Sequence, residues 1–310
     1  MANKIIFMGT PIFCVPILKS LYQNGYNISV VFTQPPQKSH RGQKINKSPI
    51  QGISETLNID YRTPKTLKDN HEEYEFLKEL NADLAIVCAY GQIIPENFLN
   101  LTKKGFVNIH ASILPSWRGA APIQRSIMNL DPETGISIMK IKKELDSGPV
   151  SNIYKIKIDQ NQNAQEISEK LSALAAEKIL DNVDDILEDK AKFIDQDHSK
   201  ATYAKKIDKE ESRIDWDEDA SKIIGKINGL FPSPGASFSF NGERYKILKA
   251  EIGNGIGQVG EIISNQLEVA CNKNQSIKIL EIQRQGKRPQ KIDEFILGSQ
   301  IKKGLFIDNV

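Results

Sequence analysis

The sequence has few cysteines and few histidines. Its 310 residues include three cysteines, Cys14, Cys88 and Cys271, which lie far apart without C-x-x-C spacing, and four histidines. An odd number of scattered cysteines favours neither a disulfide framework nor a zinc site, and it fits a reducing compartment. We therefore expect a protein without a metal.

The chain also lacks long apolar runs. None approaches the roughly 18 residues that a membrane-spanning helix needs. The first residues, MANKIIFMGT, lack the longer apolar stretch and the small-residue cleavage site of a secretory signal. We therefore expect a cytoplasmic protein that has no membrane partner.

Several motifs of common enzyme classes are absent. A dinucleotide-binding enzyme needs G-x-G-x-x-G after its first strand, where this chain has only Gly9-Thr10-Pro11. The sequence contains no G-x-x-x-x-G-K-[ST] loop, no H-E-x-x-H helix and no G-x-S-x-G elbow. These absences argue against nicotinamide enzymes, P-loop nucleotide hydrolases, zinc proteases and α/β-hydrolases.

Length and composition indicate a folded protein of two domains. Hydrophobic residues make up 39% of the chain and charged residues 26%, as in ordinary globular proteins. A length of 310 residues is long for one core and suits two. The formal net charge of +2 is too small by itself to indicate a nucleic-acid partner.

Basic residues are nevertheless concentrated in two stretches without carboxylates, residues 33–50 and 284–291. Each is a local positive patch that suits a phosphate backbone. Their basic residues are Lys38, Arg41, Lys44 and Lys47 in the first stretch and Arg284, Lys287, Arg288 and Lys291 in the second.

Hydrophobic periodicity predicts an α/β domain in the first part of the chain. Strand-like runs alternate with helical segments, which favours a Rossmann-like, mostly parallel sheet with helices on both faces. Sites in such folds lie at the carboxyl ends of the strands. Residues 33–50 are too polar for a core element and are expected to form an exposed loop. The expected strands are residues 4–8, 28–32, 84–88 and 105–109, and the expected helices lie after residue 15 and over residues 167–187.

The character of the sequence changes after about residue 205. A short helix is expected over residues 221–227, and several short strands after it favour a small, OB-like β-barrel. The expected domains are therefore residues 1–189 and 206–310, joined by a linker over 190–205. The expected strands of the barrel are residues 236–240, 245–249, 260–264, 267–271 and 277–282.

The densest cluster of polar and special residues directly follows the expected strand at 105–109. Asn108 and His110 are two apart in an extended segment, so both side chains face one side, where an amide and an imidazole suit a developing oxyanion. Equally, Asn108 can cap a turn and His110 can be a hydrogen-bonded core residue. Asp146 lies in the loop Glu-Leu-Asp-Ser-Gly-Pro, where it is either a functional carboxylate or a cap of its own backbone.

Seven short motifs are distributed along the chain. They are Met8-Gly9-Thr10-Pro11, Thr33-Gln34-Pro35, Ala89-Tyr90-Gly91, Asn108-Ile109-His110, Ser112-Ile113-Leu114-Pro115, Trp117-Arg118-Gly119-Ala120-Ala121-Pro122-Ile123 and Leu145-Asp146-Ser147-Gly148-Pro149. In this order they resemble the methionyl-tRNA formyltransferase family over nearly the whole chain. Asn108, His110 and Asp146 match positions shared by all folate-dependent formyltransferases, so they indicate the reaction class alone.

The resemblance implies transfer of a formyl group from 10-formyltetrahydrofolate to the amine of methionyl initiator tRNA. Asn108 and a protonated His110 would donate to the oxyanion, while Asp146 would hold His110 and pass a proton. It also implies that the pterin lies against Gln92, Ile93, Ile94 and the Glu144 loop, and that Ser112, Ile113, Leu114 and Pro115 line the folate. Ile93 and Ile94 are equally compatible with ordinary core residues.

For the tRNA, the resemblance implies that Arg41 inserts toward the acceptor end and that Lys38, Lys44 and Lys47 meet phosphates. Arg284, Lys287, Arg288 and Lys291 would add backbone contacts from the barrel. The alternative for the first stretch is a merely solvated loop. A monomer is expected.

Three positions depart from the family pattern: Cys14, Gln43 and Asn228. The last two are expected to weaken phosphate contacts without touching the chemistry. The rival interpretations are a formyltransferase for a nucleotide-linked amino sugar, a folate-dependent formyl hydrolase, and an RNA-binding protein with an inactive catalytic domain. Among the features that point to tRNA, the basic stretch with Arg41 has the most weight.

Overall fold

A computed structural model describes residues 3–39 and 44–307, without the side chains of residues 38, 39 and 44. Within these residues, no helix combines the length and the apolar character that crossing a bilayer requires. The chain divides into two compact units. The first consists of Met1–Gly119, Gly135–Ile156 and Ser168–Tyr203, and the second of Ala120–Thr134, Lys157–Ile167 and Ala204–Val310.

Most of the expected linker therefore belongs to the first unit, which extends to Tyr203. The second unit includes two segments that precede residue 168 in the sequence. The limits 1–189 and 206–310 for the two domains stay a prediction.

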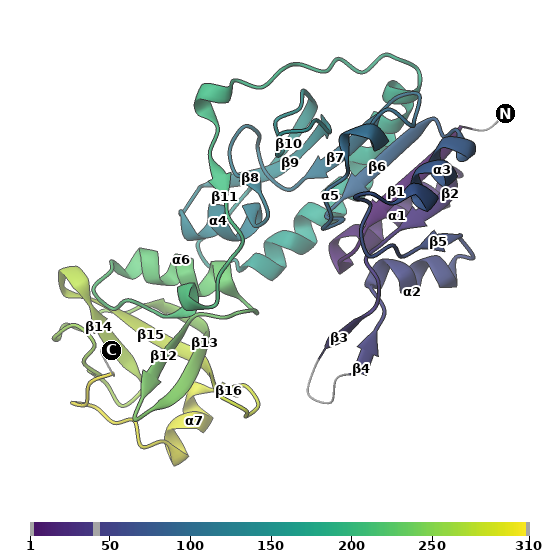
Figure 1. The fold of residues 1–310 in the computed structure, drawn as a ribbon. Helices are drawn as coiled ribbons and strands as arrows, with labels where there is room; N and C mark the ends of the chain where they lie inside the picture. The colour runs from purple at the N-terminus through teal and green to yellow at the C-terminus, as the bar shows by residue number, and fades with distance from the viewer. Residues whose placement is uncertain (1–2, 40–43, 308–310) are drawn as a thin grey trace. The chain divides into compact units, whose positions relative to one another are not determined.

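The first unit contains a seven-stranded sheet in the order β10-β9-β7-β6-β1-β2-β5 (Figure 1). The pairs of β1 with β2 and β6, of β2 with β5 and of β6 with β7 are parallel, and β9 runs antiparallel to β7. The prediction of a mostly parallel α/β sheet is confirmed. The strands are β1 (Lys4–Gly9), β2 (Asn27–Phe32), β5 (Tyr61–Arg62), β6 (Leu84–Cys88), β7 (Phe106–His110), β9 (Glu133–Lys140) and β10 (Val150–Lys157).

Helices pack on this sheet because its strands are apolar on both faces. Ile6 and Met8 of β1 pack with Leu77 of α3, whereas Ile5 and Phe7 are buried on the other face, as strand alternation requires. The helices of this unit are α1 (Val15–Gln23), α2 (Pro49–Thr56), α3 (His71–Leu80) and, from Ser168 onward, α5 (Ala164–Leu187), with 3-10 turns at Ile12–Cys14, Glu96–Phe98 and His198–Lys200.

The basic stretch at 33–50 differs from its prediction. It is not an irregular loop, because β3 (Gln37–Ser39) and β4 (Lys44–Asn46) pair antiparallel and project from the rest of the unit (Figure 1). Backbone hydrogen bonds form this hairpin without an apolar face, so the hydrophobic pattern gave no sign of strands.

The second unit contains a five-stranded antiparallel sheet in the order β12-β13-β15-β14, with β16 paired to β15. Trp216, Phe238 and Tyr245 lie in its hydrophobic core. Its elements are α6 (Ala220–Leu230), β12 (Ser237–Phe240), β13 (Glu243–Ile252), β14 (Glu268–Cys271), β15 (Gln275–Arg284), β16 (Gln290–Lys291) and α7 (Ile292–Gly298), with 3-10 turns at Glu210–Ser212 and Asn272–Asn274.

The prediction of a strand over 260–264 is wrong. Only Glu261 and Ile262 pair there, as isolated bridges to Phe306 and Val269. Alternation over five residues is too short a signal to distinguish a strand from a loop that touches a sheet at two points.

The helix α4 (Pro122–Met128) belongs to the second unit and packs against α6. Gly225 and Gly229 are four apart on one face of α6 and permit this approach. A Cβ at Gly225 would lie 2.7 Å from Leu130 Cδ2, and a Cβ at Gly229 would lie 2.5 Å from Met128 Cγ. Gly225 and Gly229 therefore have a packing role.

Candidate active site

Asn108 and His110 lie at the carboxyl end of β7, where a parallel sheet places its functional groups. The Asn108 side chain is half-buried and makes no hydrogen bond to any described residue. His110 is 6% exposed, and its Nε2 lies 3.0 Å from the carbonyl oxygen of Trp117. The strand therefore presents one amide with free hydrogen-bonding capacity and one buried imidazole.

Asp146 faces the other side of the His110 ring. Its Oδ2 lies 3.6 Å from His110 Nδ1 and accepts a 2.8 Å hydrogen bond from the Gly119 amide. Its φ of 46° is in the left-handed region, which is uncommon for a residue other than glycine. Both ring nitrogens of His110 thus face protein oxygens, and only a protonated ring has an N–H for each of them.

A segment that the sequence did not mark as functional contacts the loops beside Asn108, His110 and Asp146. Gln196 lies in the expected linker, yet it is 8% exposed, and its Nε2 donates 2.8 Å hydrogen bonds to the carbonyl oxygens of Asp146 and Gly148. Its Oε1 accepts from Arg118, which is itself 3% exposed. The basic side chain in the Trp-Arg-Gly motif therefore lies inside the protein. No local sequence pattern marks Gln196.

Two serine hydroxyl groups hold the loop after β7, one from the loop itself and one from β9. Ser112 Oγ donates to the Ser116 carbonyl at 2.6 Å, and Ser137 Oγ donates to the Ser112 carbonyl at 2.6 Å. Ser112 and Leu114 are buried, whereas Ile113 and Pro115 are partly exposed. Of the four residues expected to line the folate, only Ile113 and Pro115 have side-chain surface at which to do so.

The loop after β6 places Gln92, Ile93 and Ile94 differently from one another. Gln92 Nε2 donates to the Pro64 carbonyl at 2.9 Å, and Ile94 packs against the core. Ile93 is 89% exposed, so it is not a core residue. Burial raises the pKa of the neighbouring Tyr90 well above its usual value, which keeps that phenol a hydrogen-bond donor to Gln92.

Glu144 is exposed and lines a cavity of about 710 Å³. Phe106, Lys140 and Phe193 contribute to the walls of this cavity, and Lys140 Nζ lies 4.9 Å from the centre of the Phe193 ring. Gln92, Ile93 and Ile94 are not among its lining residues. The structure therefore places one of the four residues expected at the pterin in this hollow.

The basic residues of the first stretch are only partly described. Arg41 lies outside the described residues, as does Gln43. Lys38 and Lys44 belong to the β3–β4 hairpin. Lys47 Nζ pairs with the Glu55 carboxylate at 2.9 Å, so it is an exposed cation that already has a partner.

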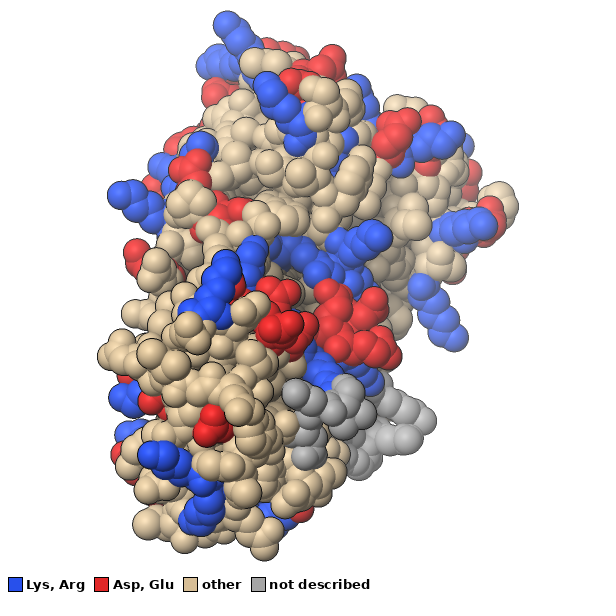
Figure 2. Space-filling model, turned by 90° about the vertical axis from the view of Figure 1, so that its left-hand side faces the viewer, with Lys and Arg blue, Asp and Glu red and all other residues tan. Residues whose placement is uncertain are grey.

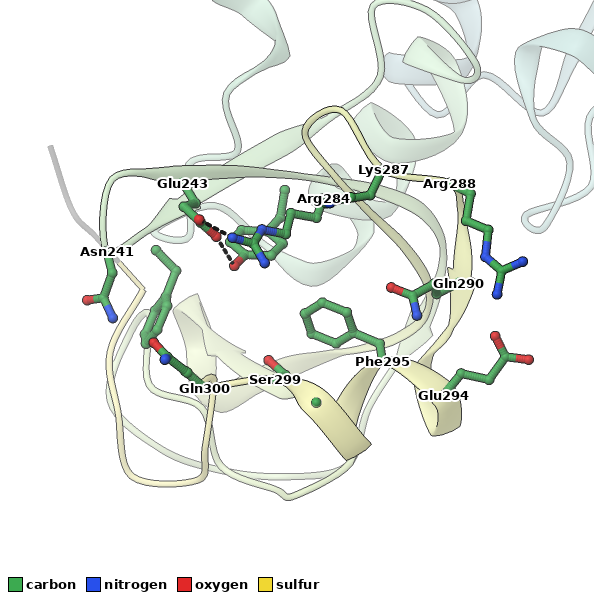
Figure 3. A pocket seen from close by; sticks show the side chains of 13 residues that line it. Asn241, Glu243, Arg284, Lys287, Arg288, Gln290, Glu294, Phe295, Ser299 and Gln300 are labelled. Atoms are coloured by element: carbon green, nitrogen blue, oxygen red, sulfur yellow. Dashed lines mark hydrogen bonds and ion pairs between the residues drawn. The ribbon is translucent and has the colours of Figure 1, made fainter.

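Three of the four basic residues of the second stretch line a pocket of about 550 Å³ in the second unit (Figure 3). Arg284 points at Glu243 and pairs with it, while Arg288 extends along the opposite side of the pocket. Lys287 also lines it. Lys291 is exposed at the start of α7.

Asn228, the second departure expected to affect phosphate contacts, is 8% exposed, and its amide donates to the Gln160 carbonyl at 3.0 Å. Its side chain therefore supports packing inside the second unit and presents little surface to a phosphate. Within residues 3–39 and 44–307, no group of three or more histidine, cysteine or carboxylate side chains is placed to hold a metal ion.

Two family models match the chain over most of its length. The model described as formyl transferase covers residues 3–183, and the model described as formyl transferase, C-terminal domain, covers residues 206–300. The α/β fold and these two matches define a formyltransferase.

Relatives in other organisms identify the family within the formyltransferases to which this chain belongs. The methionyl-tRNA formyltransferase of Pelagibacter ubique is 66% identical over 310 residues, which are 100% of both chains. The methionyl-tRNA formyltransferase of Brucella anthropi is 40% identical over 307 residues, which cover 97% of this chain and 100% of the relative. The chain belongs to the methionyl-tRNA formyltransferase family.

A solved structure has the same fold at low identity. It is the N-formyltransferase from Helicobacter canadensis in complex with folinic acid and dTDP-3-aminofucose, with a TM-score of 0.70 and 18% identity. The match covers 92% of this chain and 100% of that chain. At this identity the likeness concerns the fold alone.

Proposed function

We propose that the protein transfers the formyl group of 10-formyltetrahydrofolate to the amino group of methionyl initiator tRNA. The observation that carries this proposal is the full-length relationship to methionyl-tRNA formyltransferases, at 66% identity in one relative. The half-buried Asn108 amide beside the His110–Asp146 pair supports it chemically, because acyl transfer to an amine needs donors for an oxyanion.

Asn108 is the first donor in this proposal. Because its amide has no hydrogen bond to a described residue, it can donate to the formyl oxygen without leaving another group unpaired. His110 can act as a second donor only when its Nε2–H leaves the Trp117 carbonyl, 3.0 Å away. Asp146, 3.6 Å from Nδ1, faces the imidazole. It is placed to take the proton that the attacking amine loses and to pass it, directly or through water, to the folate nitrogen that leaves as its bond to the formyl carbon breaks.

The formyl donor fits beside the loops that carry Ile93 and Glu144. The exposed Ile93 side chain offers apolar surface to a flat ring. Ile113 and Pro115 retain exposed surface for the same ligand. When bound, the folate supplies the formyl group, and these residues orient it toward Asn108.

The tRNA contacts are proposed on charge and position. Lys38 and Lys44 belong to the strands of the β3–β4 hairpin, and Arg41 lies between them in the sequence, so the three cations are close together along the chain. Lys47 has to exchange Glu55 for a phosphate. Figure 2 shows Lys and Arg interspersed with Asp and Glu over one face, so binding there depends on local clusters rather than on a field of one sign.

In the second unit, Lys287 and Arg288 are exposed cations beside a pocket and are placed to contact phosphates. Arg284 contributes less, because Glu243 already neutralises it. Lys291 extends the same basic stretch.

The second unit is proposed to be a small, OB-like β-barrel. Isolated bridges extend the pairing beyond both edges of its sheet, at Arg213–Ser237 beside β12 and at Ile262–Val269 beside β14. Such coverage supports closure, which removes unpaired edges. The protein is proposed to act as a monomer, which sedimentation at working concentration tests.

The rival proposal is formyl transfer to a nucleotide-linked amino sugar, the ligand class named for the Helicobacter canadensis protein. The test is transfer of labelled formyl from 10-formyltetrahydrofolate to methionyl initiator tRNA, with an amino-sugar nucleotide as a parallel acceptor. His110→Ala should abolish transfer and Arg41→Ala should weaken it. His71→Ala, at an exposed histidine of α3, is the matched control. Labelled sugar without labelled tRNA would reject the proposal.

A further inference from the structure

The segment 194–202 is attached at both ends to the loops that carry the candidate site. Near its start, Ile194 and Val150 exchange two backbone hydrogen bonds of 2.8 and 2.9 Å. Near its end, Thr202 Oγ1 accepts from the Trp117 amide at 2.8 Å, and the Thr202 carbonyl oxygen accepts from the Arg118 amide at 2.8 Å. The segment therefore bridges the loop after β7 and the loop before β10.

Gln196 is the side chain of this segment that reaches the site. Its amide nitrogen has two hydrogens, and they meet the carbonyl oxygens of Asp146 and Gly148, both at 2.8 Å. Its amide oxygen accepts from Arg118 Nε at 3.1 Å and from Arg118 Nη2 at 2.7 Å. All the hydrogen-bonding capacity of the amide is used by these four contacts.

Arg118 also determines which way the Gln196 amide points. Guanidinium groups only donate and carbonyl oxygens only accept, so the amide oxygen must face Arg118 and the nitrogen must face Asp146. His198 Nδ1, 3.2 Å from Arg118 Nη2, holds the guanidinium from the other side. Gln196 and Arg118 are 8% and 3% exposed, so water does not replace these contacts.

Asp146 needs such support because of its backbone. A residue other than glycine persists in the left-handed region only where its surroundings hold it, and Asp146 has a φ of 46°. Its carboxylate must also keep two directed contacts, 2.8 Å to the Gly119 amide and 3.6 Å to His110 Nδ1. Rotation of this peptide would move the carboxylate away from the imidazole.

We propose that Gln196, oriented by Arg118, is a positioning residue that fixes Asp146 against His110, and that segment 194–202 completes the active site rather than linking domains. This inference rests on the proposed formyl transfer for its kinetic consequence. Its structural consequence, the placement of the Asp146 carboxylate, is measurable without any substrate.

Two variants separate the contacts of Gln196. Gln196→Glu keeps an acceptor for Arg118 but sets a carboxylate against the carbonyl oxygens of Asp146 and Gly148. Gln196→Met removes both sets of contacts, including the oxygen that accepts from Arg118 Nε and Nη2. Asn182→Asp is the matched control, because it makes the same amide-to-acid change at a buried amide that donates to the Lys178 carbonyl within α5.

Both Gln196 variants should lower kcat in formyl transfer about 10- to 100-fold with KM changed less than about twofold, since a misplacement of about 1 Å costs on this order. Gln196→Met should also lower the Tm, whereas Gln196→Glu should fold like the wild type. In both variants the Gly119 amide, which donates to Asp146, should exchange its hydrogen faster than in the wild type. Asn182→Asp should leave kcat and Gly119 exchange unchanged.

Folded Gln196→Glu protein with wild-type kcat and wild-type Gly119 exchange would overturn the inference. An increase in KM alone, or a loss of Tm without a loss of kcat, would do the same, because a purely structural residue behaves in that way. If the wild type formylates no methionyl-tRNA but Gly119 exchange rises in both variants, the proposed function fails while the positioning of Asp146 by Gln196 is supported.

Discussion

Replacement of Gly148 by alanine tests whether the Asp146 loop must sit where the structure has it. A Cβ at this position would lie 1.8 Å from the carbonyl oxygen of Lys140 and 3.4 Å from Met139 Cε. The first contact is with backbone, which cannot rotate away as a flexible side chain can. Relief therefore requires that the loop and β9 separate by more than about 1 Å, a distortion that close-packed interiors resist.

A displacement of the loop at Gly148 would also move Asp146 in the candidate site. Gly148 is two residues from Asp146, and its carbonyl oxygen accepts one of the two hydrogen bonds from Gln196. We expect Gly148→Ala to lose about 1–3 kcal/mol of unfolding free energy, the usual cost of overpacking. We also expect kcat to fall about 100-fold, since misplacing a catalytic group by about 1 Å has this effect.

The assay is steady-state formyl transfer to methionyl initiator tRNA, normalised to the folded fraction, together with denaturant unfolding. Gly52→Ala in α2 is the control, because a Cβ there has no atom within 4 Å. It should leave kcat unchanged and raise stability by up to about 1 kcal/mol, as Gly-to-Ala changes in helices do. A folded Gly148→Ala protein with wild-type kcat would refute the assignment of Asp146 to the chemistry.

Three further outcomes are expected. Asn108→Ala should lower kcat about 100- to 1000-fold with an unchanged Tm, because it removes a partly exposed amide that donates only to the oxyanion. A change confined to KM would argue against that role. Lys287→Ala combined with Arg288→Ala should reduce the slope of the log binding constant for tRNA against log salt concentration by about 1 per residue. Lys222→Ala on α6 is the control and should leave this slope unchanged. If the double variant has the wild-type slope, these residues of the second unit do not contact tRNA phosphates. Hydrogen bonding to Arg125 holds the pKa of the Glu211 carboxyl below its usual value. This pair should therefore stabilise the fold above the unfolded-state pKa of about 4.3 and lose its effect as the pH falls through the lower folded-state pKa. Glu211→Gln should cost about 0.5–1 kcal/mol in urea unfolding at pH 7, and this difference should shrink as the pH is lowered and disappear once the carboxyl is protonated in the folded protein.

Local patterns predicted the elements whose signals are long or strongly apolar. The continuous apolar run at 84–88 corresponds to β6 (Leu84–Cys88), and the helical period over 167–187 falls within α5 (Ala164–Leu187). Such elements can be predicted from the sequence because burial selects apolar residues at every strand position or on every helical turn. The β3–β4 hairpin and the isolated bridges at 261–262 carry no comparable signal, and they were the places where the expectation differed from the structure.

The sequence by itself also brought out the candidate triad, since Asn108, His110 and Asp146 stand in recognisable motifs. It did not indicate how His110 is held between Trp117 and Asp146, or that Arg118 is buried. Nor did it assign Gln196 a role. Arg118 lies 78 residues from Gln196 along the chain, and Gln196 lies 50 residues from Asp146. Polar contacts at such separations leave no periodicity in the sequence, because each partner is chosen by the position of the other in the folded chain, and only the tertiary structure brings them together.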